Sequence, residues 1–204
     1  MCGIAGAFSY RDDGPPVSTA ECLRMSEHMR NRGPDGEGLW ASRDQRACLV
    51  HRRLAIIDPT PDGAQPMSGR DGRYTLVFNG EIYNYRELGA ELERCGVVLK
   101  GHSDTEVLLQ LFERHGAGML SRLRGMYAFA IWDAERRSLF LARDPFGIKP
   151  LYCCDDGTTF RFSSQVKALL AGGGVAKVTE PAGLVGYWIW GHVPEPWTDR
   201  KSVG

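Results

Sequence analysis

The chain has 204 residues, of which 43% are hydrophobic and 25% charged, with 25 Lys plus Arg against 25 Asp plus Glu. This length and composition predict one ordinary globular domain with a sizeable core. The balanced charge excludes a general attraction to nucleic acid or to an anionic membrane, and no apolar run reaches the ~20 residues that span a bilayer. We also expect no signal peptide, because a charged segment followed by a long apolar run is missing at the start.

The six cysteines and five histidines lack the spacing of a metal or disulfide site. No two cysteines form a C-x-x-C pair, and only Cys153 and Cys154 are close together, so neither a zinc site nor a disulfide framework is predicted. The histidines show no H-x-x-x-H spacing. We therefore expect no bound metal, a reducing environment and a cytoplasmic location.

Strand-like segments dominate the chain. Runs rich in aromatic, β-branched or leucine residues, bounded by Gly, Asp or Asn, predict strands at residues 4–8, 39–41, 48–51, 74–78, 126–132, 139–142 and 160–162. A polar turn at residues 133–137 is predicted to join two of them into a hairpin.

Four helices are predicted, at residues 22–29, 85–96, 107–116 and 165–170. Ser18 and Ser103 each stand three positions before a glutamate, which is the pattern of a capping box. Asn84 is expected to cap the second helix, and Gly96 to end it. Strands in hairpin-like succession, interrupted by grouped helices, favour an α+β fold with antiparallel sheets over a Rossmann pattern.

A glycine run at residues 172–174 predicts a boundary, with one domain at 2–171 before it. Residues 172–204 are too few for a second core, which indicates a linker or the start of a missing domain. The final DRKSVG, residues 199–204, continues no earlier pattern and can be encoded by a string that resembles a sequencing adapter. We expect these last residues to be an artefact at the end of a truncated chain.

The chain begins MCGIAGAF, so that removal of Met1 turns Cys2 into the N-terminal residue. One interpretation is a buried cysteine at the start of a core strand, since free Cys is among the most buried residue types. The other is a nucleophile whose own α-amine is the general base. These eight residues alone favour the buried cysteine.

The pair Asn79-Gly80 in VFNGEIYN also allows two interpretations. Asn-Gly is the strongest short signal for a hairpin turn, but a capped helix follows instead of a second strand. A strand-to-helix junction that carries a side-chain amide and a glycine N–H is a plausible oxyanion hole. From these residues alone the two interpretations remain open.

Two arginines end the predicted strand in HRRLAIID. Arg52 is predicted to be a solvated charge. Arg53 is followed by apolar residues, so its half-buried guanidinium needs a partner, for which a bidentate carboxylate is the natural choice. Asp104 lies at the start of a helix, where the helix dipole by itself favours an acid.

Taken together, Cys2, NRGPDGEG, HRRLAIID, FNGEIYN, SDTE, LRGMYAFAIWD and RDPFGIKPLYC resemble, in order and spacing, the glutaminase domain of asparagine synthetases. The resemblance covers residues 2–170. It implies a class II glutamine amidotransferase of the N-terminal nucleophile hydrolase type. The implied fold is α+β, a four-layer αββα sandwich of two mainly antiparallel sheets.

The resemblance also implies a role for each site residue. With Met1 removed, Cys2 attacks glutamine to give a γ-glutamyl thioester and ammonia, and its α-amine, with an ordinary pKa of ~7.7–8.0, takes the thiol proton. The Asn79 amide and the Gly80 N–H form the oxyanion hole. Arg53 binds the α-carboxylate of glutamine, and Asp104 with Glu81 binds its α-ammonium. Backbone of four further residues lines the pocket, namely Leu54, Ala55, Ile56 and Ile57.

One residue and one domain depart from the family pattern. Cys153 stands where the family more often has an aromatic residue, and we expect this to change packing but not catalysis. No S-G-G-x-D-S-like sequence occurs in the chain. ATP and Mg²⁺ are therefore expected only in a missing synthetase domain, with no cofactor for the glutaminase half. Expected partners are glutamine, the covalently linked synthetase domain and, for the full-length protein, a second copy in a homodimer.

Three alternatives remain. Amidotransferases for sugar-phosphate or phosphoribosyl amination tend to carry His before the Asn-Gly pair, whereas this chain has Phe78. Relatives from polysaccharide or secondary-metabolite clusters share such a glutaminase half and amidate another acceptor. An inactive glutamine-binding module is the third alternative, and the presence of Cys2, Arg53, Asn79 and Asp104 argues against it.

Overall fold

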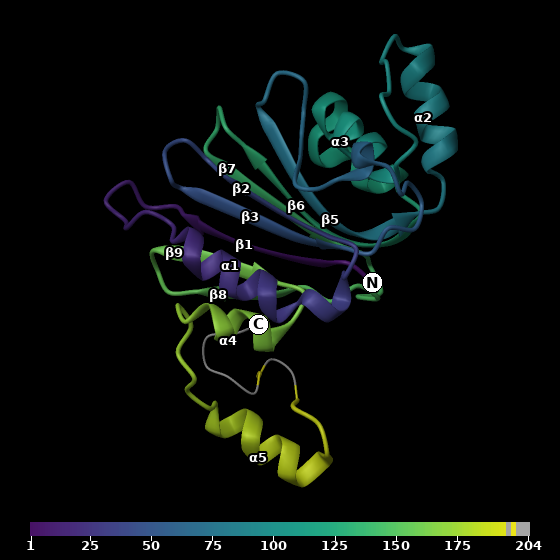
Figure 1. Ribbon diagram of the computed structural model, residues 1–204. Helices are drawn as coiled ribbons and strands as arrows, with labels where there is room; N and C mark the ends of the chain where they lie inside the picture. The colour runs from purple at the N-terminus through teal and green to yellow at the C-terminus, as the bar shows by residue number, and fades with distance from the viewer. Residues whose placement is uncertain (195–196, 199–204) are drawn as a thin grey trace.

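The computed structural model describes residues 1–194 and 197–198, and the predicted artefactual tail at 199–204 lies outside the described residues. The described residues form two antiparallel sheets, with strand orders β2-β3-β1-β9-β8 and β4-β5-β6-β7 (Figure 1). The strands are β1 Gly3–Ser9, β2 Gly36–Ala41, β3 Ala47–Arg53, β4 Met67–Ser68, β5 Tyr74–Ile82, β6 Gly125–Asp133, β7 Ser138–Arg143, β8 Tyr152–Asp155 and β9 Thr159–Ser163. The α-helices are α1 Thr19–His28, α2 Tyr85–Arg94, α3 Asp104–His115, α4 Val166–Gly172 and α5 Pro181–Trp190, and 3₁₀ helices cover Arg30–Arg32, Pro61–Gly63 and Gly116–Arg122.

The two sheets pack face to face between two layers of helices (Figure 1). Helices α1 and α4 cover the outer face of the five-stranded sheet, where Ala5 and Ala7 of β1 face them. Helices α2 and α3 cover the outer face of the four-stranded sheet. Ile4 of β1 and Val77 of β5 meet in the layer between the sheets. This is the four-layer αββα arrangement that the motifs implied.

All seven predicted strands are present, and β1 is the core strand expected for the N-terminal segment. Side chains of a strand alternate between its two faces, so β1 supplies both the inter-sheet layer and the layer under the helices. Two strands were not predicted. Strand β4 has only two residues, too few to show any alternation, and β8 lies at the edge of its sheet with two of its four residues exposed.

Both predicted serine caps are confirmed. The Ser18 hydroxyl accepts a hydrogen bond from the Glu21 N–H at 3.3 Å, and the Ser103 hydroxyl accepts one from the Glu106 N–H at 3.2 Å. The return bonds of a capping box are replaced by others. Glu21 Oε1 accepts from Arg161 Nε at 2.6 Å, and the Glu106 carboxylate accepts from backbone N–H groups of the preceding loop. The glutamates serve tertiary contacts, since a charge-assisted bond outweighs a bond to a solvated N–H.

The prediction that the Asn84 side chain caps α2 is wrong. Asn84 does occupy the N-cap position, but its side chain makes no capping hydrogen bond. Its Nδ2 donates to the Arg122 carbonyl and its Oδ1 accepts from the Arg124 N–H, both at 3.0 Å. The amide is used there because the loop entering β6 presents a backbone acceptor and a backbone donor that would otherwise lack partners.

The prediction that Arg52 is a solvated charge is also wrong. Arg52 is only 8% exposed, and its guanidinium pairs with Glu27 of α1 at 2.6 Å and with Glu37 of β2 at 2.7 Å. Strand β3 lies inside its sheet, between β2 and β1. A long side chain from such a strand is covered by the neighbouring helix, so its charge has to be paired.

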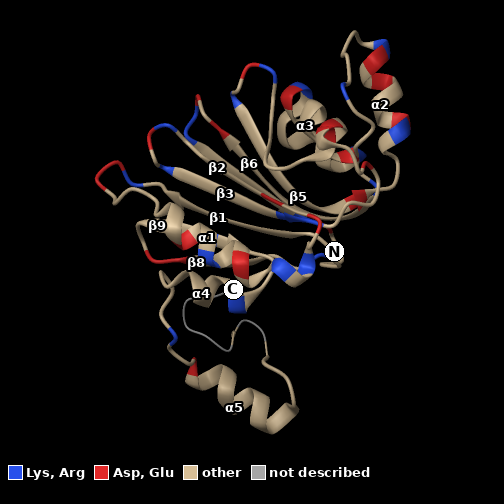
Figure 2. Ribbon diagram, viewed as in Figure 1, with Lys and Arg blue, Asp and Glu red and all other residues tan. Residues whose placement is uncertain are grey.

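The segment after the sandwich has a different character. Gly173 ends α4 with a φ of 87°, and Val175 is buried in the core beneath α1. Helix α5 then stands apart from the sheets (Figure 1) and exposes its large apolar side chains, with Trp188 at 78%. Figure 2 shows both signs of charge interspersed over the sandwich and no charge along α5. No helix in the described part of the chain is long and apolar enough to cross a bilayer.

Candidate active site

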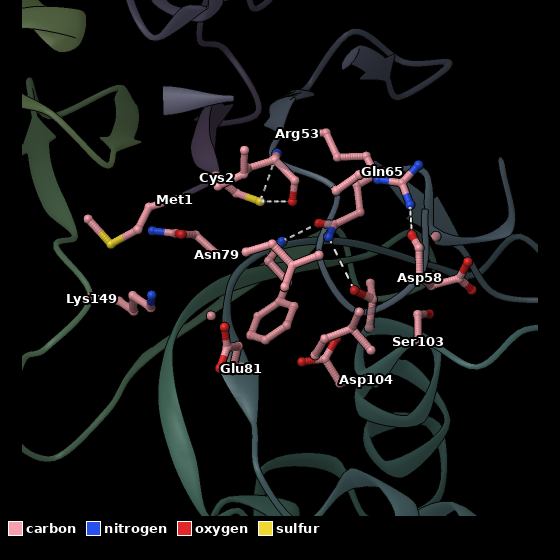
Figure 3. A pocket seen from close by; sticks show the side chains of 18 of the residues that line it. Met1, Cys2, Arg53, Asp58, Gln65, Asn79, Glu81, Ser103, Asp104 and Lys149 are labelled. Carbon is pink, nitrogen blue, oxygen red and sulfur yellow. Dashed lines mark hydrogen bonds between the residues drawn. The ribbon is translucent and has the colours of Figure 1, made fainter. Parts of the chain in front are cut away.

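A cavity of about 270 Å³ lies where the ends of β1 and β3 meet β5 and the start of α3. Figure 3 shows Met1 and Lys149 on one side of it and Arg53 and Asp58 on the other. The structure brings together every residue that the sequence motifs predicted for the site. The predicted residues that line this one cavity are Cys2, Arg53, Leu54, Ala55, Ile56, Ile57, Asn79, Gly80, Glu81 and Asp104.

Cys2 directly precedes β1 and is half-buried. Strand β1 pairs with β3 up to Gly3 opposite Arg52, so the chain past the end of β3 runs beside the thiol. The Leu54 N–H lies 3.4 Å from Sγ, and the Leu54 carbonyl lies 3.6 Å from it. A thiol can donate to that carbonyl, and a thiolate can accept from that N–H. The backbone of Leu54 therefore holds the sulfur in both protonation states.

Arg53 is the last residue of β3, and its guanidinium is held by the loop that follows. One Nη donates to the Thr60 carbonyl at 2.9 Å and the other to the Asp58 carbonyl. A Cβ at Gly63 would come within 2.9 Å of the Asp58 carbonyl oxygen and would displace the guanidinium from its place. Among the described residues no carboxylate pairs with Arg53, and the expected carboxylate partner is not supplied by the protein. A guanidinium has five N–H donors, so an oriented fork remains for a carboxylate that enters the cavity.

Asn79 and Gly80 lie inside β5, so the hairpin interpretation is wrong. The strand continues through them to Ile82, because β6 pairs with it all along, with Asn79 opposite Ala128 and Gly80 opposite Tyr127. A Cβ at position 80 would come within 2.8 Å of the Tyr127 Cα and would collide with the Met126 carbonyl. Only glycine allows the two strands to approach this closely.

The Asn79 side chain carries a buried donor without a partner. Asn79 is 1% exposed, and its Nδ2 has no hydrogen-bond partner among the residues that the structure describes. Two residues earlier, Val77 packs between the sheets. By the alternation of a strand, the Asn79 amide also faces this layer, which β1 enters directly after Cys2. Leaving a buried donor unpaired costs ~1–3 kcal/mol. The fold bears this cost at a position that lines the cavity.

Two carboxylates face the cavity opposite Arg53. Asp104 is the first residue of α3, where its Oδ2 accepts from the Ile82 N–H at 3.0 Å, and it is only 5% exposed. Burial raises the pKa of Asp104 to about 6, and the nearby negative charge of Glu81 adds to the increase. A cation bound between the two carboxylates would relieve both effects, so this end of the cavity is suited to an ammonium group.

Sequence reasoning missed Gln65. This residue lies in the loop before β4, is 9% exposed and lines the cavity. Its Oε1 accepts from the Phe78 N–H at 2.6 Å, and its Nε2 donates to the Thr105 hydroxyl at 3.2 Å. Both contacts are distant in sequence, and the surrounding GAQPM shows no strand or helix pattern. No local signal therefore identified it.

Sequence reasoning also missed Lys149, although it lies in the motif RDPFGIKPLY. Lys149 is 5% exposed and lines the cavity. Its loop is ordered by Asp144, which accepts from the N–H groups of Phe146, Ile148 and Lys149. Burial raises the pKa of Asp144, but these hydrogen bonds outweigh it and hold the pKa below its ordinary value. Cys153 of the next strand packs between the sheets and does not line the cavity.

Curated relatives share most of this sequence. The chain is 40% identical over 199 residues to "Asparagine synthetase [glutamine-hydrolyzing] 1" of Bacillus subtilis, which covers 97% of this chain and 31% of that protein. It is 39% identical over 171 residues to "Asparagine synthetase B [glutamine-hydrolyzing]" of Escherichia coli, which covers 83% of this chain and 30% of that protein. The chain thus spans about a third of the length of these relatives.

Solved structures share the fold. The glutamine phosphoribosylpyrophosphate amidotransferase of B. subtilis, solved with ADP and GMP, matches with a TM-score of 0.71 at 24% identity, over 89% of this chain and 46% of that one. A structure described as the allosteric regulatory enzyme of purine biosynthesis matches with a TM-score of 0.66 at 26% identity, with the same coverage. The expected fold of the N-terminal nucleophile hydrolase type is confirmed.

The family model of the glutamine amidotransferase domain matches residues 1–203, which is nearly the whole chain. This match agrees with the relatives and with the cavity that gathers all the predicted site residues. The chain therefore belongs to the glutamine amidotransferase domain family and matches the glutaminase half of glutamine-hydrolysing asparagine synthetases.

Proposed function

We propose that this chain hydrolyses glutamine to glutamate and ammonia with Cys2 as nucleophile. The observation that carries the proposal is the cavity in which a half-buried thiol meets a buried amide donor, Asn79 Nδ2, that has no partner. An amide nitrogen in that state is a preformed donor for charge that develops during a reaction. Nucleophile and donor thus belong to residues that line one cavity.

The first half of the reaction forms a thioester. With Met1 removed, the free α-amine of Cys2 takes the thiol proton, and the sulfur attacks the γ-carbonyl carbon of glutamine. Asn79 Nδ2 and the Gly80 N–H donate to the oxygen that becomes negative. The carbon–nitrogen bond then breaks, and the α-ammonium returns its proton to the leaving group, which departs as ammonia.

The second half restores the enzyme. The α-amine takes a proton from water as the water oxygen attacks the thioester carbon. The carbon–sulfur bond breaks, glutamate is released and the thiolate recovers the proton. While Met1 remains, the nitrogen of Cys2 belongs to a peptide bond and is no base, so removal of Met1 is part of the proposal.

The remaining polar groups suit the two charges of the substrate. Arg53 offers its oriented guanidinium to the α-carboxylate, and Asp104 with Glu81 accepts the α-ammonium. The backbone of residues 54–57 lines the cavity beside them. One cation and two carboxylates match a zwitterionic amino acid.

In the whole protein, we propose that the released ammonia amidates aspartate in an ATP- and Mg²⁺-dependent synthetase domain linked to this one. The support is the names of the relatives and their length, about three times that of the matched region. Helix α5 carries no charge and exposes large apolar side chains, which supports its being covered by the linked domain in the whole protein. The cytoplasmic location and the homodimer of the full-length protein belong to the same proposal. Another acceptor, as in polysaccharide or secondary-metabolite amidation, would leave the glutaminase half unchanged.

The test is ammonia release from glutamine by the purified chain, read together with its intact mass. We expect a mass without Met1, ammonia and glutamate in equal amounts, and no activity in Cys2→Ala. Asparagine should not appear when aspartate and ATP are added to this chain alone. Full activity in Cys2→Ala would show that the proposed nucleophile is wrong.

A further inference from the structure

Strand β5 pairs with β4 at only two residues, and beyond them this edge of β5 has no neighbouring strand among the described residues. Strand β4 pairs with β5 only at Met67 opposite Leu76 and at Ser68 opposite Thr75. In an antiparallel sheet, the N–H groups of alternate residues point to the same neighbour. The N–H groups of Phe78, Gly80 and Ile82 therefore point to the side where no strand follows β4.

Side chains take the place of the missing strand at two of these three groups. The Phe78 N–H donates to Gln65 Oε1 at 2.6 Å, and the Ile82 N–H donates to Asp104 Oδ2 at 3.0 Å. Between them, the Gly80 N–H lies on the same open edge by the alternation of the strand, and Gly80 lines the cavity. The proposed oxyanion donor is thus flanked on both sides by N–H groups that are already held.

Gln65 is itself anchored at both ends. Its Nε2 donates to the hydroxyl of Thr105, the residue after Asp104 in α3. Its main chain lies so close to β2 that a Cβ at Gly38 would collide with the Gln65 carbonyl and come within 2.9 Å of Pro66 Cδ. The Gln65 side-chain amide thereby joins β5 to the first turn of α3, and the main chain of the same residue packs against β2.

We propose that Gln65 is a positioning residue for glutamine hydrolysis: it replaces the missing ladder partner of β5 and so fixes the direction of the Gly80 N–H. This inference rests on the proposed glutaminase function. The position needs a side chain that accepts from the Phe78 N–H and donates to the Thr105 hydroxyl. The Gln65 amide does both, with Oε1 and Nε2 respectively. Gln65 acts through β5 and through Thr105.

The experiment compares Gln65→Met with Gln110→Met in the full chain. Gln110 is a half-buried glutamine of α3 that bonds to Glu113 and lies outside the cavity, so it is a matched control. For Gln65→Met we expect kcat to fall ~10–100-fold and KM for glutamine to change less than ~3-fold, since an oxyanion donor acts on the transition state. Alkylation of Cys2 by iodoacetamide needs no oxyanion hole and should keep its rate.

Amide hydrogen exchange provides a readout that needs no turnover. In the wild type we expect slow exchange at Phe78 and faster exchange at Gly80, and in Gln65→Met an accelerated exchange at Phe78. Gln65→Glu keeps an acceptor for the Phe78 N–H and should keep that amide protected. Thr105→Val removes only the hydrogen bond between Gln65 Nε2 and the Thr105 hydroxyl. This variant replaces Gln65→Met in the same measurements if Gln65→Met does not fold.

Several outcomes would overturn the inference. One is a kcat of Gln65→Met equal to that of Gln110→Met, and another is unchanged exchange at Phe78 in Gln65→Met. The third is an equal loss of kcat, alkylation rate and thermal stability in Gln65→Met, which would indicate a merely structural role. If the wild-type chain released no ammonia from glutamine, the proposed function would fail instead. The exchange at Phe78 and Gly80 would then still decide whether Gln65 holds the edge of β5.

Discussion

On the β3 wall of the cavity, formed by Cys2, Arg53 and Leu54, the polar groups already have protein partners: the thiol contacts the Leu54 backbone, and the guanidinium donates to two carbonyls. On the β5 wall, formed by Asn79, Gly80 and Glu81, the Asn79 amide nitrogen is buried and has no hydrogen-bond partner in the described part of the chain. The groups of the β3 wall are held before a ligand arrives, whereas in the proposed reaction the β5 wall supplies donors for the charge that develops at the transition state. In the proposed reaction, the unpaired donor therefore stabilises the transition state, and the groups that are already held bind the substrate in the ground state.

The largest effect expected from this comparison is on the β5 wall. Asn79→Ala should lower kcat by ~10²–10³-fold, because it removes an oxyanion donor. The free energy of unfolding should fall by less than ~1 kcal/mol, because the amide nitrogen has no hydrogen bond to lose. Stopped-time ammonia assays and thermal denaturation measure the two quantities.

The exposed Asn31 offers a control for that change, since it lies outside the cavity. Asn31→Ala should alter both quantities little. A loss of stability in Asn79→Ala as large as the loss of activity would remove the distinction between the two walls.

A smaller effect, of a different kind, is expected on the β3 wall. Arg53→Gln should raise KM for glutamine ~10–100-fold, because a charge-assisted pair with the α-carboxylate is worth ~1.5–3 kcal/mol. The kcat value should change much less. The measurement compares glutamine with 4-aminobutanamide, which lacks the α-carboxylate. If Arg53→Gln impaired both substrates equally, Arg53 would not bind that group.

The pH dependence of binding tests Asp104. Its pKa is raised to about 6, so the carboxylate becomes protonated as the pH falls through 6 and can no longer pair with an ammonium. Calorimetry on Cys2→Ala, which binds without turnover, should show glutamine affinity falling below pH 6. Asp104→Asn should bind more weakly at pH 7 and lose this dependence between pH 5 and 7. A dependence that persists in Asp104→Asn would have to come from another group.

The same pKa shift has a consequence for stability. Because the folded-state pKa lies above the ordinary value of 3.8, ionisation of Asp104 disfavours the folded state as the pH rises from about 4 to about 6, and the penalty persists above 6. Asp104→Asn should therefore be more stable than the wild type at pH 7, by about 1–3 kcal/mol. Urea denaturation at pH 4 and pH 7 measures this, and the difference between the variants should nearly vanish at pH 4.

Helix α5 serves as the reference region, because it belongs to neither wall and none of its residues lines the cavity. A chain that ends at Lys177 keeps the buried Val175 and removes α5. Its kcat and KM should stay within about two-fold of the full chain, as expected for a change at the surface. A large loss of kcat in this shorter chain would contradict the predicted domain at 2–171.

The motifs predicted which residues line the cavity better than they predicted the hydrogen bonds that hold those residues in place. Four site residues were found because each lies in a motif of known order and spacing: Cys2 directly before β1, Arg53 in β3, Asn79 in β5 and Asp104 in α3. Gln65 was missed because its importance depends on the open edge of β5, which exists only once the sheet is formed. No residue type or spacing in its own segment records that edge.

The predictions that failed share a physical cause. Arg52 was expected in solvent because arginine is mostly exposed, yet its strand lies inside a sheet beneath α1, where Glu27 and Glu37 pair with it. The Asn84 side chain was expected to cap α2, yet it bonds instead to the backbone of Arg122 and Arg124 in the loop before β6. Strand β5 was expected to end before Asn79-Gly80, yet pairing with β6 continues it. In each case a tertiary contact overrides the local preference.

The most direct test of Cys2 as both nucleophile and base concerns Met1. One preparation that retains Met1 is divided, and half is treated with methionine aminopeptidase, with the intact mass recorded for both halves. We predict ammonia release from glutamine only in the fraction whose mass lacks Met1, because only there is the Cys2 nitrogen a free amine. Equal ammonia release from the fraction that retains Met1 would contradict the claim that the thiol and its base belong to the same residue.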